Sequence, residues 1–229
     1  GKDFKNVILV NDNYANLPEI LGKNKLPKAD GLIIDLGFSS EQLESGKGFS
    51  FQKDEPLDMR YNTETGMTAA EVVNSFSEKN LAEILWKYGE ERFSRQIAKK
   101  IVEERREKRI LTTFDLTEVV KKAVPRNYER GRIHPATRTF QALRIYVNDE
   151  LGNLEKLLNN LPKILKAKGR AAIISFHSLE DRLVKNAFRE LKTKKIAEIL
   201  TKKPITSGEE EVRQNPRSRS AKMRAVQFI

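Results

Sequence analysis

Short apolar runs separated by helical patterns constrain the fold of this 229-residue chain most. The first two are NVILV at residues 6–10, which precedes a turn-like NDN sequence, and GLIID at residues 31–35. The third is RAAIISF at residues 170–176. Runs of this kind are typical of a parallel sheet that helices cover on both faces. We therefore predict a buried strand at each run and an α/β fold.

The middle of the chain has helical periodicity instead. Phe93, Ile97 and Ile101 recur at the spacing of one helical face. A T-x-x-E sequence at Thr68 predicts one helix start, and Ser77 is the predicted N-cap of the next helix. This part of the chain is therefore expected to be all-helical.

The sheet pattern returns near the end of the chain. Leucines at helical spacing predict a helix that ends at Gly169, before the RAAIISF strand. Ser178 is the predicted cap of a following helix, and residues 221–229 form a predicted late strand. The expected organisation is a sheet domain in two parts with a helical insertion between them: residues 1–41, 42–147 and 148–229.

Composition narrows the classes of function. The chain has 43 Lys and Arg against 32 Asp and Glu, a formal net charge of +11. This excess favours a polyanionic partner, nucleic acid first and an anionic membrane second; a merely solvated Lys- and Glu-rich surface is the alternative. The lack of cysteine excludes disulfides and Cys-ligated zinc. No apolar run approaches the roughly 20 residues of a membrane span, and no signal peptide is visible, so we expect a cytoplasmic location.

Polar residues stand at the carboxyl ends of two predicted strands, the edge where open α/β sheets bind ligands. Asp35 ends one strand, and His177 follows the other. If the two strands are neighbours, we expect one crevice lined by Asp35, Ser39, Ser40, Gln42, His177 and Ser178. The alternative is that Asp35 only caps a helix and that the irregular sequence up to Asn62 is a solvated loop.

Several longer stretches resemble the bacterial MraW/RsmH family. They are LIIDLGFSSEQL, YGEERFSRQIAKKIV, HPATRTFQALRIYVNDEL and ISFHSLEDRLVK, followed by NPRSRSAKMR. The resemblance implies an S-adenosylmethionine-dependent enzyme that methylates the N4 amine of a cytidine in the decoding region of small-subunit (16S) rRNA. It also implies a Rossmann-like methyltransferase sheet with an inserted helical domain for substrate recognition.

The resemblance carries the family's cofactor site onto three residues. Tyr14 is the aromatic residue that would pack on adenine, Asp35 is the acid at a strand end, and Gln42 belongs to an S-S-x-Q motif. The family's glycine-rich D-G-T-x-G-x-G-G-H motif has no match in this chain. We therefore expect the methyltransferase sheet to be incomplete at its N-terminus.

Asp35 is the candidate catalytic residue. The cytosine N4 amine is a poor nucleophile, and an acceptor for one of its protons would favour attack on a methyl group. Amino-methylating DNA enzymes use a D-P-P-Y-type tetrapeptide at the equivalent position, where this chain has Asp35-Leu36-Gly37-Phe38. We expect Phe38 near the target base. The alternative is that Asp35 serves only the cofactor.

Further residues are candidates for positioning RNA. They lie in the stretches that resemble the family and in the long loop, and they are Arg60, His134, Arg138, Arg144, His177 and Ser178. Phe49 and Phe51 are expected either to stack on a base that leaves its helix or to anchor the long loop to the core. The basic helix from about Arg92 to Arg109 and the basic segments at residues 126–132 and 215–224 are candidates for phosphate contacts. For each of them a solvated charged face is the alternative. No metal site is expected from two distant histidines without cysteine.

Two functions from different classes are left open by the sequence. One is an RNA cytosine-N4 methyltransferase, and the other is a catalytically silent RNA-binding fragment without a complete cofactor site. Both predict small-subunit rRNA or the ribosomal subunit as the partner and no membrane. Homodimerisation is left open.

Overall fold

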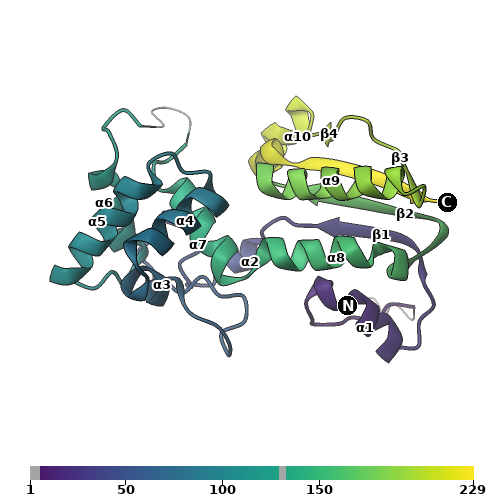
Figure 1. The fold of residues 1–229 in the computed structure, drawn as a ribbon, viewed down its shortest axis with the longest axis horizontal. Helices are drawn as coiled ribbons and strands as arrows, with labels where there is room; N and C mark the ends of the chain where they lie inside the picture. Colours follow the sequence, from purple (N-terminus) through teal and green to yellow (C-terminus); the bar gives the residue numbers. More distant parts are fainter. Residues whose placement is uncertain (1–5, 129–132) are drawn as a thin grey trace. The chain divides into compact units, whose positions relative to one another are not determined.

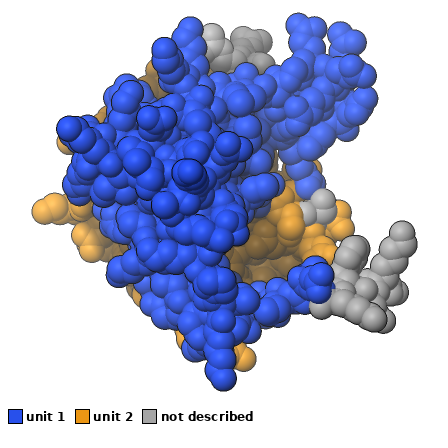
Figure 2. All heavy atoms as spheres, turned by 90° about the vertical axis from the view of Figure 1, so that its right-hand side faces the viewer, with its two compact units in different colours: residues 1–37, 151–229 blue, residues 38–150 orange. Residues whose placement is uncertain are grey.

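The structure is a computed structural model that describes residues 6–128 and 133–229 (Figure 1). The chain divides into two compact units (Figure 2). Unit 1 consists of residues 1–37 and 151–229, and unit 2 consists of residues 38–150. Each unit has its own cluster of buried apolar side chains.

Unit 1 contains a mixed sheet of strands β1 (Ala29–Asp35), β2 (Leu165–Ser175), β3 (Ala197–Ile199), β4 (Ile205–Thr206) and β5 (Lys222–Phe228). The order is β1-β2-β5-β3, and β4 also pairs with β5. β1 and β2 are parallel, whereas β5 runs antiparallel to β2, β3 and β4. The predicted α/β class and the predicted late strand are confirmed.

The helices assigned to unit 1 are η1 (Tyr14–Asn16), α1 (Leu17–Lys23), α8 (Glu150–Ile164), α9 (Ser178–Thr193), α10 (Glu209–Gln214) and η2 (Pro216–Ser220). Leucines of α8 and residues such as Phe188 of α9 are buried together against Ile173 and Val226 of the sheet. Burying one such side chain contributes about 1.5–3 kcal/mol. This packing fixes the two long helices on one face of the sheet.

The opposite face of the sheet is more open than the sequence predicted. Alternate residues of a strand point to opposite faces, and Ile33 pairs with Ala172, next to the buried Ile173. Ile33 is 77% exposed. The prediction of a sheet covered on both faces is therefore wrong for the described residues, since none of them buries Ile33 on the face opposite Ile173.

The run at residues 6–10 forms no strand in the structure. Its side chains are exposed, and Leu9 is 91% exposed. A strand is stable only when a neighbour accepts its hydrogen bonds, and no described strand pairs with this run. The predicted strand is therefore wrong, although its β-branched composition is that of a strand.

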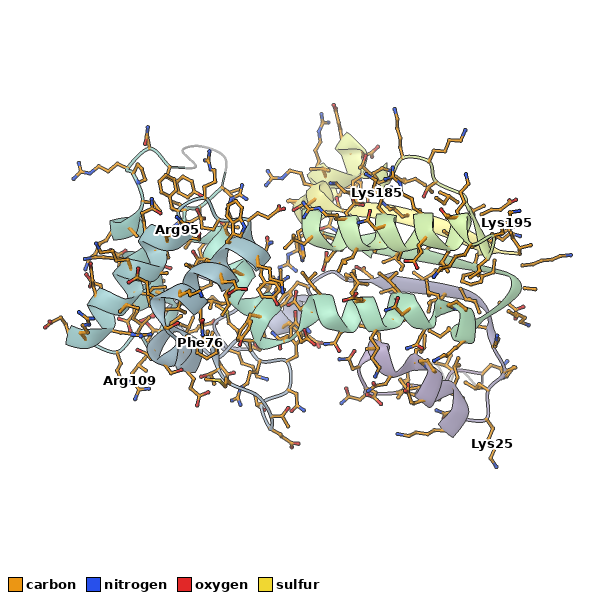
Figure 3. The ribbon with its side chains drawn as sticks, in the orientation of Figure 1. Lys25, Phe76, Arg95, Arg109, Lys185 and Lys195 are labelled. Atoms are coloured by element: carbon orange, nitrogen blue, oxygen red, sulfur yellow. The ribbon has the colours of Figure 1, made fainter. Side chains whose placement is uncertain are left out.

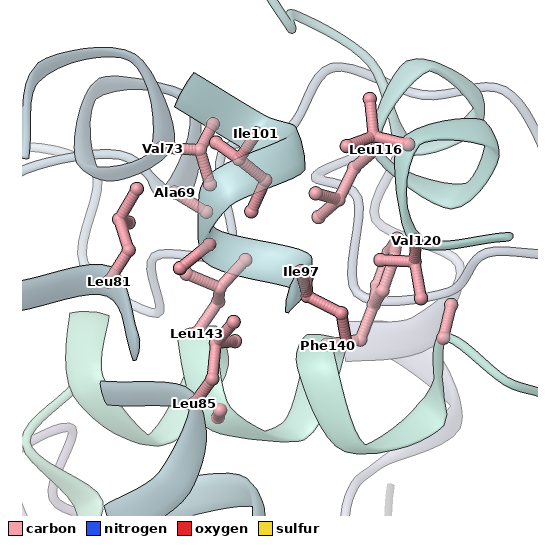
Figure 4. Close-up of a cluster of buried hydrophobic side chains, with 14 of the residues drawn as sticks. Ala69, Val73, Leu81, Leu85, Ile97, Ile101, Leu116, Val120, Phe140 and Leu143 are labelled. Carbon is pink, nitrogen blue, oxygen red and sulfur yellow. The ribbon is translucent and has the colours of Figure 1, made fainter. Parts of the chain in front are cut away.

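Unit 2 contains α2 (Ser40–Leu43), α3 (Ala69–Ser75), α4 (Glu78–Gly89), α5 (Ser94–Glu107), α6 (Thr113–Ala123) and α7 (Thr137–Val147). Figure 4 shows its core, to which every helix except α2 contributes. Gly89 lies where α4 meets α7, and a Cβ there would be 2.6 Å from the carbonyl oxygen of Arg138. The close approach of these two helices therefore requires glycine.

Two helix starts follow the sequence. The Thr68 hydroxyl accepts a hydrogen bond from Glu71 N, and the Glu71 carboxylate accepts one from Thr68 N. Ser77 caps α4 through a bond from Asn80 N. Both predicted caps are confirmed.

Among the described helices none is long and apolar enough to cross a membrane.

Two boundaries differ from the prediction. α8 ends at Ile164, and β2 begins at Leu165 instead of after Gly169. Leucine periodicity does not mark where a helix ends, and the pairing of Leu165 with Ala29 of β1 starts the strand early. The N-cap of α9 is His177, not Ser178, which is the first residue of that helix.

Candidate active site

The two strands that end at the candidate residues are neighbours. β1 and β2 are parallel, and Asp35 lies opposite Ile174 in their register. Leu36 N continues the pairing with a 3.0 Å hydrogen bond to Ile174 O. The condition on which the predicted crevice depends is therefore met within unit 1, because Asp35 and His177 both follow the carboxyl ends of paired strands.

Asp35 presents an exposed carboxylate at this edge. Its Oδ1 accepts a 2.8 Å hydrogen bond from Gly37 N. A Cβ on Gly37 would lie 2.8 Å from that oxygen and 2.8 Å from the ring of Phe176. Only glycine fits this close turn, which holds one carboxylate oxygen in place. Among the described residues no other hydrogen bond to Asp35 is formed, so Oδ2 is available to a donor.

His177 belongs to a capping box. Its Nδ1 accepts a hydrogen bond from Glu180 N at 3.4 Å, and Glu180 Oε2 accepts bonds from Phe176 N at 2.8 Å and His177 N at 3.3 Å. His177 Nε2 lies 3.2 Å from Glu180 Oε1, outside hydrogen-bond geometry. The side chain is only 11% exposed. Its position at the strand end is thus explained by helix capping, while Ser178 is exposed beside it.

Tyr14 stands at the start of η1, where Asn13 Oδ1 accepts a hydrogen bond from Ala15 N. The Tyr14 ring is half-buried and packs against the core of unit 1 together with Leu17 and Leu21. Packing against the core therefore fixes the position of the Tyr14 ring.

Gln42 and Ser39 cap α2 reciprocally. Gln42 Oε1 accepts a hydrogen bond from Ser39 N at 3.0 Å, and Ser39 Oγ accepts one from Gln42 N at 3.1 Å. Among the described residues nothing accepts a hydrogen bond from Gln42 Nε2. The residue borders a cavity of about 350 Å³ whose lining consists of Ser39, Glu41, Gln42, Ser45, Lys47, Phe49, Arg60 and Tyr61. The side chain of Ser40 lies outside the description.

Three aromatic rings of unit 2, from Phe38, Phe49 and Tyr61, form one group, here called the aromatic group. The ring centroids of Phe38 and Phe49 are 4.9 Å apart, and Phe49 stacks on Tyr61 at 5.5 Å. Phe49 and Phe51 also pack against the helical core. Their role as anchors of the long loop is therefore confirmed, and the aromatic group borders the cavity at Gln42.

Glu150 holds the aromatic group together. Its carboxylate accepts two hydrogen bonds from Arg144, at 2.8 and 2.9 Å, and one from the Tyr61 hydroxyl at 2.8 Å. The Arg144 guanidinium in turn lies 5.1 Å from the centre of the Phe38 ring. The sequence prediction named Arg144 and Phe38 but missed Tyr61 and Glu150, because contacts between residues 89 positions apart leave no local pattern.

Arg60 is fixed by an ion pair within the loop. Its Nε and Nη2 donate to the Asp58 carboxylate at 2.7 and 3.0 Å, and Nη1 donates to Gly66 O at 3.2 Å. Hydrogen bonding from Arg60 lowers the pKa of Asp58 below its ordinary value. The guanidinium still borders the cavity.

His134 precedes α7 and contacts the long loop. Its ring stacks on Phe51 at 4.5 Å, and its Nδ1 accepts a bond from Ala136 N at 3.2 Å. Burial, and then the charge of Lys121, lower the pKa of His134 below its ordinary value, so the ring is neutral near pH 7. Arg138 is half-buried in α7. Residues 129–132 of the predicted basic loop lie outside the described residues.

The sequence profile of the MraW methylase family matches residues 2–229. The ribosomal RNA small subunit methyltransferase H of Synechocystis sp. is 56% identical, over 95% of this chain and 68% of the relative. The proteins of that name from Acidobacterium capsulatum and Sulfurihydrogenibium sp. are 51% and 47% identical, over 99% and 100% of this chain and 74% and 78% of theirs. A profile match of this extent, with relatives of this similarity, shows that the chain belongs to the MraW methylase family.

Proposed function

We propose that this chain transfers a methyl group from S-adenosylmethionine to the N4 amine of a cytidine in the decoding region of small-subunit rRNA. Family membership and the names of the relatives support methylation of small-subunit rRNA. The observation that carries the N4 assignment is the exposed Asp35 carboxylate, held at the ends of two parallel strands with one oxygen left for a donor.

Three residues fit the cofactor by the chemistry of their side chains. Tyr14 offers an aromatic ring for adenine, and Asp35 offers a carboxylate acceptor. Gln42 offers the two N–H groups of Nε2, because its capping bond uses only Oε1. When bound, S-adenosylmethionine supplies an electrophilic methyl carbon. The part of the protein is to hold the acceptor amine in line with that carbon and to exclude water.

Asp35 serves as the acceptor for one N4 proton of the target cytosine. The lone pair of the exocyclic amine is delocalised into the ring, so the amine attacks weakly. A carboxylate that accepts an N4 proton localises the lone pair and stabilises the positive charge that develops on nitrogen. The bond from Gly37 N fixes the orientation of the Asp35 carboxylate before the substrate arrives.

The target base must leave its stack to reach a carboxylate at a sheet edge. In the proposal Phe38, supported by Phe49 and Tyr61, provides an aromatic platform near that base. The residues proposed to position the surrounding RNA are Arg60, His134, Arg138, Arg144, His177 and Ser178. Arg144 acts in part through Phe38, because its guanidinium is already held by Glu150.

The proposal is tested in two steps on the 229-residue chain. Calorimetric titration with S-adenosylmethionine measures cofactor binding. Small ribosomal subunits that lack the modification are then incubated with cofactor carrying a labelled methyl group, and the rRNA is digested to nucleosides whose masses identify the modified position. The variants are Asp35→Asn and, as the matched control on the same strand, Asp30→Asn, since Asp30 is exposed and among the described residues forms an ion pair only with Lys166.

We expect N4-methylcytidine from the unaltered chain and a loss of roughly 10²–10³ in turnover for Asp35→Asn, the usual effect of removing one preorganised stabilising group. Asp30→Asn should leave turnover unchanged. Equal turnover of the two variants would refute the acceptor role. Folded chain that binds rRNA but no cofactor would support the RNA-binding alternative, and methylation of another atom would refute the N4 assignment.

A further inference from the structure

A second cavity of unit 2 lies where α5 begins and α6 has ended. It has a volume of about 290 Å³ and is lined by Arg92, Phe93, Pro125, Asn127 and Tyr128. None of these residues takes part in the site proposed for methyl transfer.

The walls of this cavity are aromatic and cationic. The rings of Phe93 and Tyr128 meet edge to face, with centroids 4.9 Å apart. The Arg92 guanidinium lies 5.6 Å from the centre of the Tyr128 ring. Aromatic rings and guanidinium planes are the groups on which proteins stack unpaired RNA bases. The amide of Asn127 adds both a donor and an acceptor, which is what the edge of a base requires.

A buried carboxylate, that of Glu91, is hydrogen-bonded to two residues that line the cavity. Glu91 has no exposed surface. The Tyr128 hydroxyl lies 2.7 and 2.9 Å from its two oxygens and donates to it, and Phe93 N donates at 2.8 Å. Burying a carboxylate costs free energy unless it is hydrogen-bonded. An apolar residue such as leucine would not carry this cost. Glu91 instead fixes the ring of Tyr128 and the start of α5.

Arginines without ion-pair partners occur at and near the lining residues in the sequence. Arg92, Arg95 and Arg126 are exposed, and within the described part of the chain none of them has an ion-pair partner. Three lysines of α5 and α6 differ, because Lys100, Lys121 and Lys122 are all paired with glutamates. Arg95 follows Arg92 by three residues and Arg126 precedes Asn127, so uncompensated guanidinium groups adjoin the lining residues in the sequence and suit a ligand with a planar base and flanking phosphates.

We propose that this cavity binds one unpaired nucleobase of the substrate rRNA, other than the cytidine that is methylated. The base stacks on the exposed Arg92 guanidinium beside Phe93, Asn127 contacts its edge, and Arg95 and Arg126 contact the adjoining phosphates. The inference rests on the proposed function in taking rRNA as the partner. A free nucleotide has the same chemistry, and the test below separates the two sources.

The test compares two arginines that change the net charge equally. Arg92→Ala removes the stacking group, whereas Arg109→Ala removes an exposed charge beyond the far end of α5, about 20 Å away at 1.5 Å per residue. Figure 3 shows Arg95 and Arg109 at different ends of this part of the unit. Binding of a labelled single-stranded RNA with the decoding-region sequence is measured by fluorescence anisotropy, with cytidine monophosphate as a competitor.

We expect Arg92→Ala to weaken RNA binding roughly 10-fold, within the range for the loss of one stacked base, and Arg109→Ala to weaken it roughly twofold at most. Asn127→Ala should weaken binding without any change of charge. Ultraviolet crosslinking of the unaltered protein should attach RNA to a peptide that contains Phe93 or Tyr128. This second readout needs no variant and so does not depend on variant folding.

Three results would overturn the inference. Equal losses for Arg92→Ala and Arg109→Ala, with methyl transfer intact in the unaltered chain, would mean nonspecific attraction and would leave the proposed function standing. Direct binding of cytidine monophosphate that Arg92→Ala abolishes, with RNA binding unchanged in the same variant, would assign the cavity to a free nucleotide. Absence of any RNA binding by the unaltered chain, with methyl transfer to ribosomal subunits intact, would refute the inference and leave the proposed function standing.

Discussion

At Glu91 a carboxylate without exposed surface depends on two neighbours for its hydrogen bonds, Tyr128 and the backbone of Phe93. Asp35 is the opposite case, because its carboxylate is exposed and one oxygen receives only the bond from Gly37. The two acids therefore have different uses. Glu91 fixes structure around it, and Asp35 keeps an oxygen for a ligand.

Tyr128→Phe should lower the free energy of unfolding by about 1–3 kcal/mol, because it leaves a buried carboxylate short of a donor while the ring still fits. Urea unfolding of the purified variant measures this change. Tyr61→Phe is the control: it removes a hydroxyl that also donates to a glutamate, but at a residue that is 42% exposed. Its expected loss is about 0.5–1 kcal/mol. Equal losses would mean that the burial of Glu91 does not increase the contribution of the Tyr128 hydrogen bond to the free energy of unfolding.

Helix α9 is held at its first turn by two sets of contacts. His177 caps its N-terminus. Arg224 of β5 donates to both oxygens of Asp181, at 2.7 and 3.1 Å, and this bonding lowers the pKa of Asp181 below its ordinary value. The helix start is thus tied to the sheet at the same edge where Asp35 lies.

Capping and RNA contact make different predictions for His177. His177→Ala should lower the free energy of unfolding by about 0.5–2 kcal/mol, whereas His177→Asn should preserve it, since asparagine is a good N-cap. If the imidazole also positions RNA, the Asn variant should keep its stability and raise the KM for ribosomal subunits. An Asn variant with unchanged KM would show that His177 is needed only as a cap. Thermal unfolding and methyl-transfer kinetics provide the two readouts.

Local signals predicted elements well, and signals that depend on distant partners did not. The caps at Thr68 and Ser77 are correct because a cap is formed by residues three apart. The strand at residues 6–10 is wrong because the same apolar sequence forms a strand only beside a partner. The end of α8 was misplaced because a leucine pattern is compatible with both the helix and the strand that follows.

In the candidate site, too, the features that depend on local sequence were predicted and those that depend on distant contacts were not. Asp35 and His177 could be placed together because parallel pairing brings strand ends to one edge. The sequence did not reveal that Glu150 joins Arg144 to Tyr61, or that Tyr128 covers Glu91. These contacts depend on how the helices of unit 2 pack, which no local pattern encodes.

The whole molecule has 43 Lys and Arg against 32 Asp and Glu, so a formal net charge of +11 remains after every acidic residue is counted. Long-range attraction of rRNA follows from this charge, but it does not select a sequence. Selection requires groups that contact bases. We therefore expect two kinds of arginine, those that contact phosphates and those that contact bases. Substituting them should change the salt dependence of RNA binding in different ways.

The salt dependence of RNA binding separates these two kinds. For single strands the logarithm of the binding constant falls with the logarithm of salt concentration by about 0.7 for each phosphate contacted. Arg126→Ala should therefore reduce the slope by about 0.7, and its effect should fade at high salt. Arg92→Ala should weaken binding at every salt concentration with a smaller change in slope, because stacking on a base releases no counterion. The same reduction of slope in both variants would mean that Arg92 contacts a phosphate, and the cavity at Tyr128 would then have no base to hold.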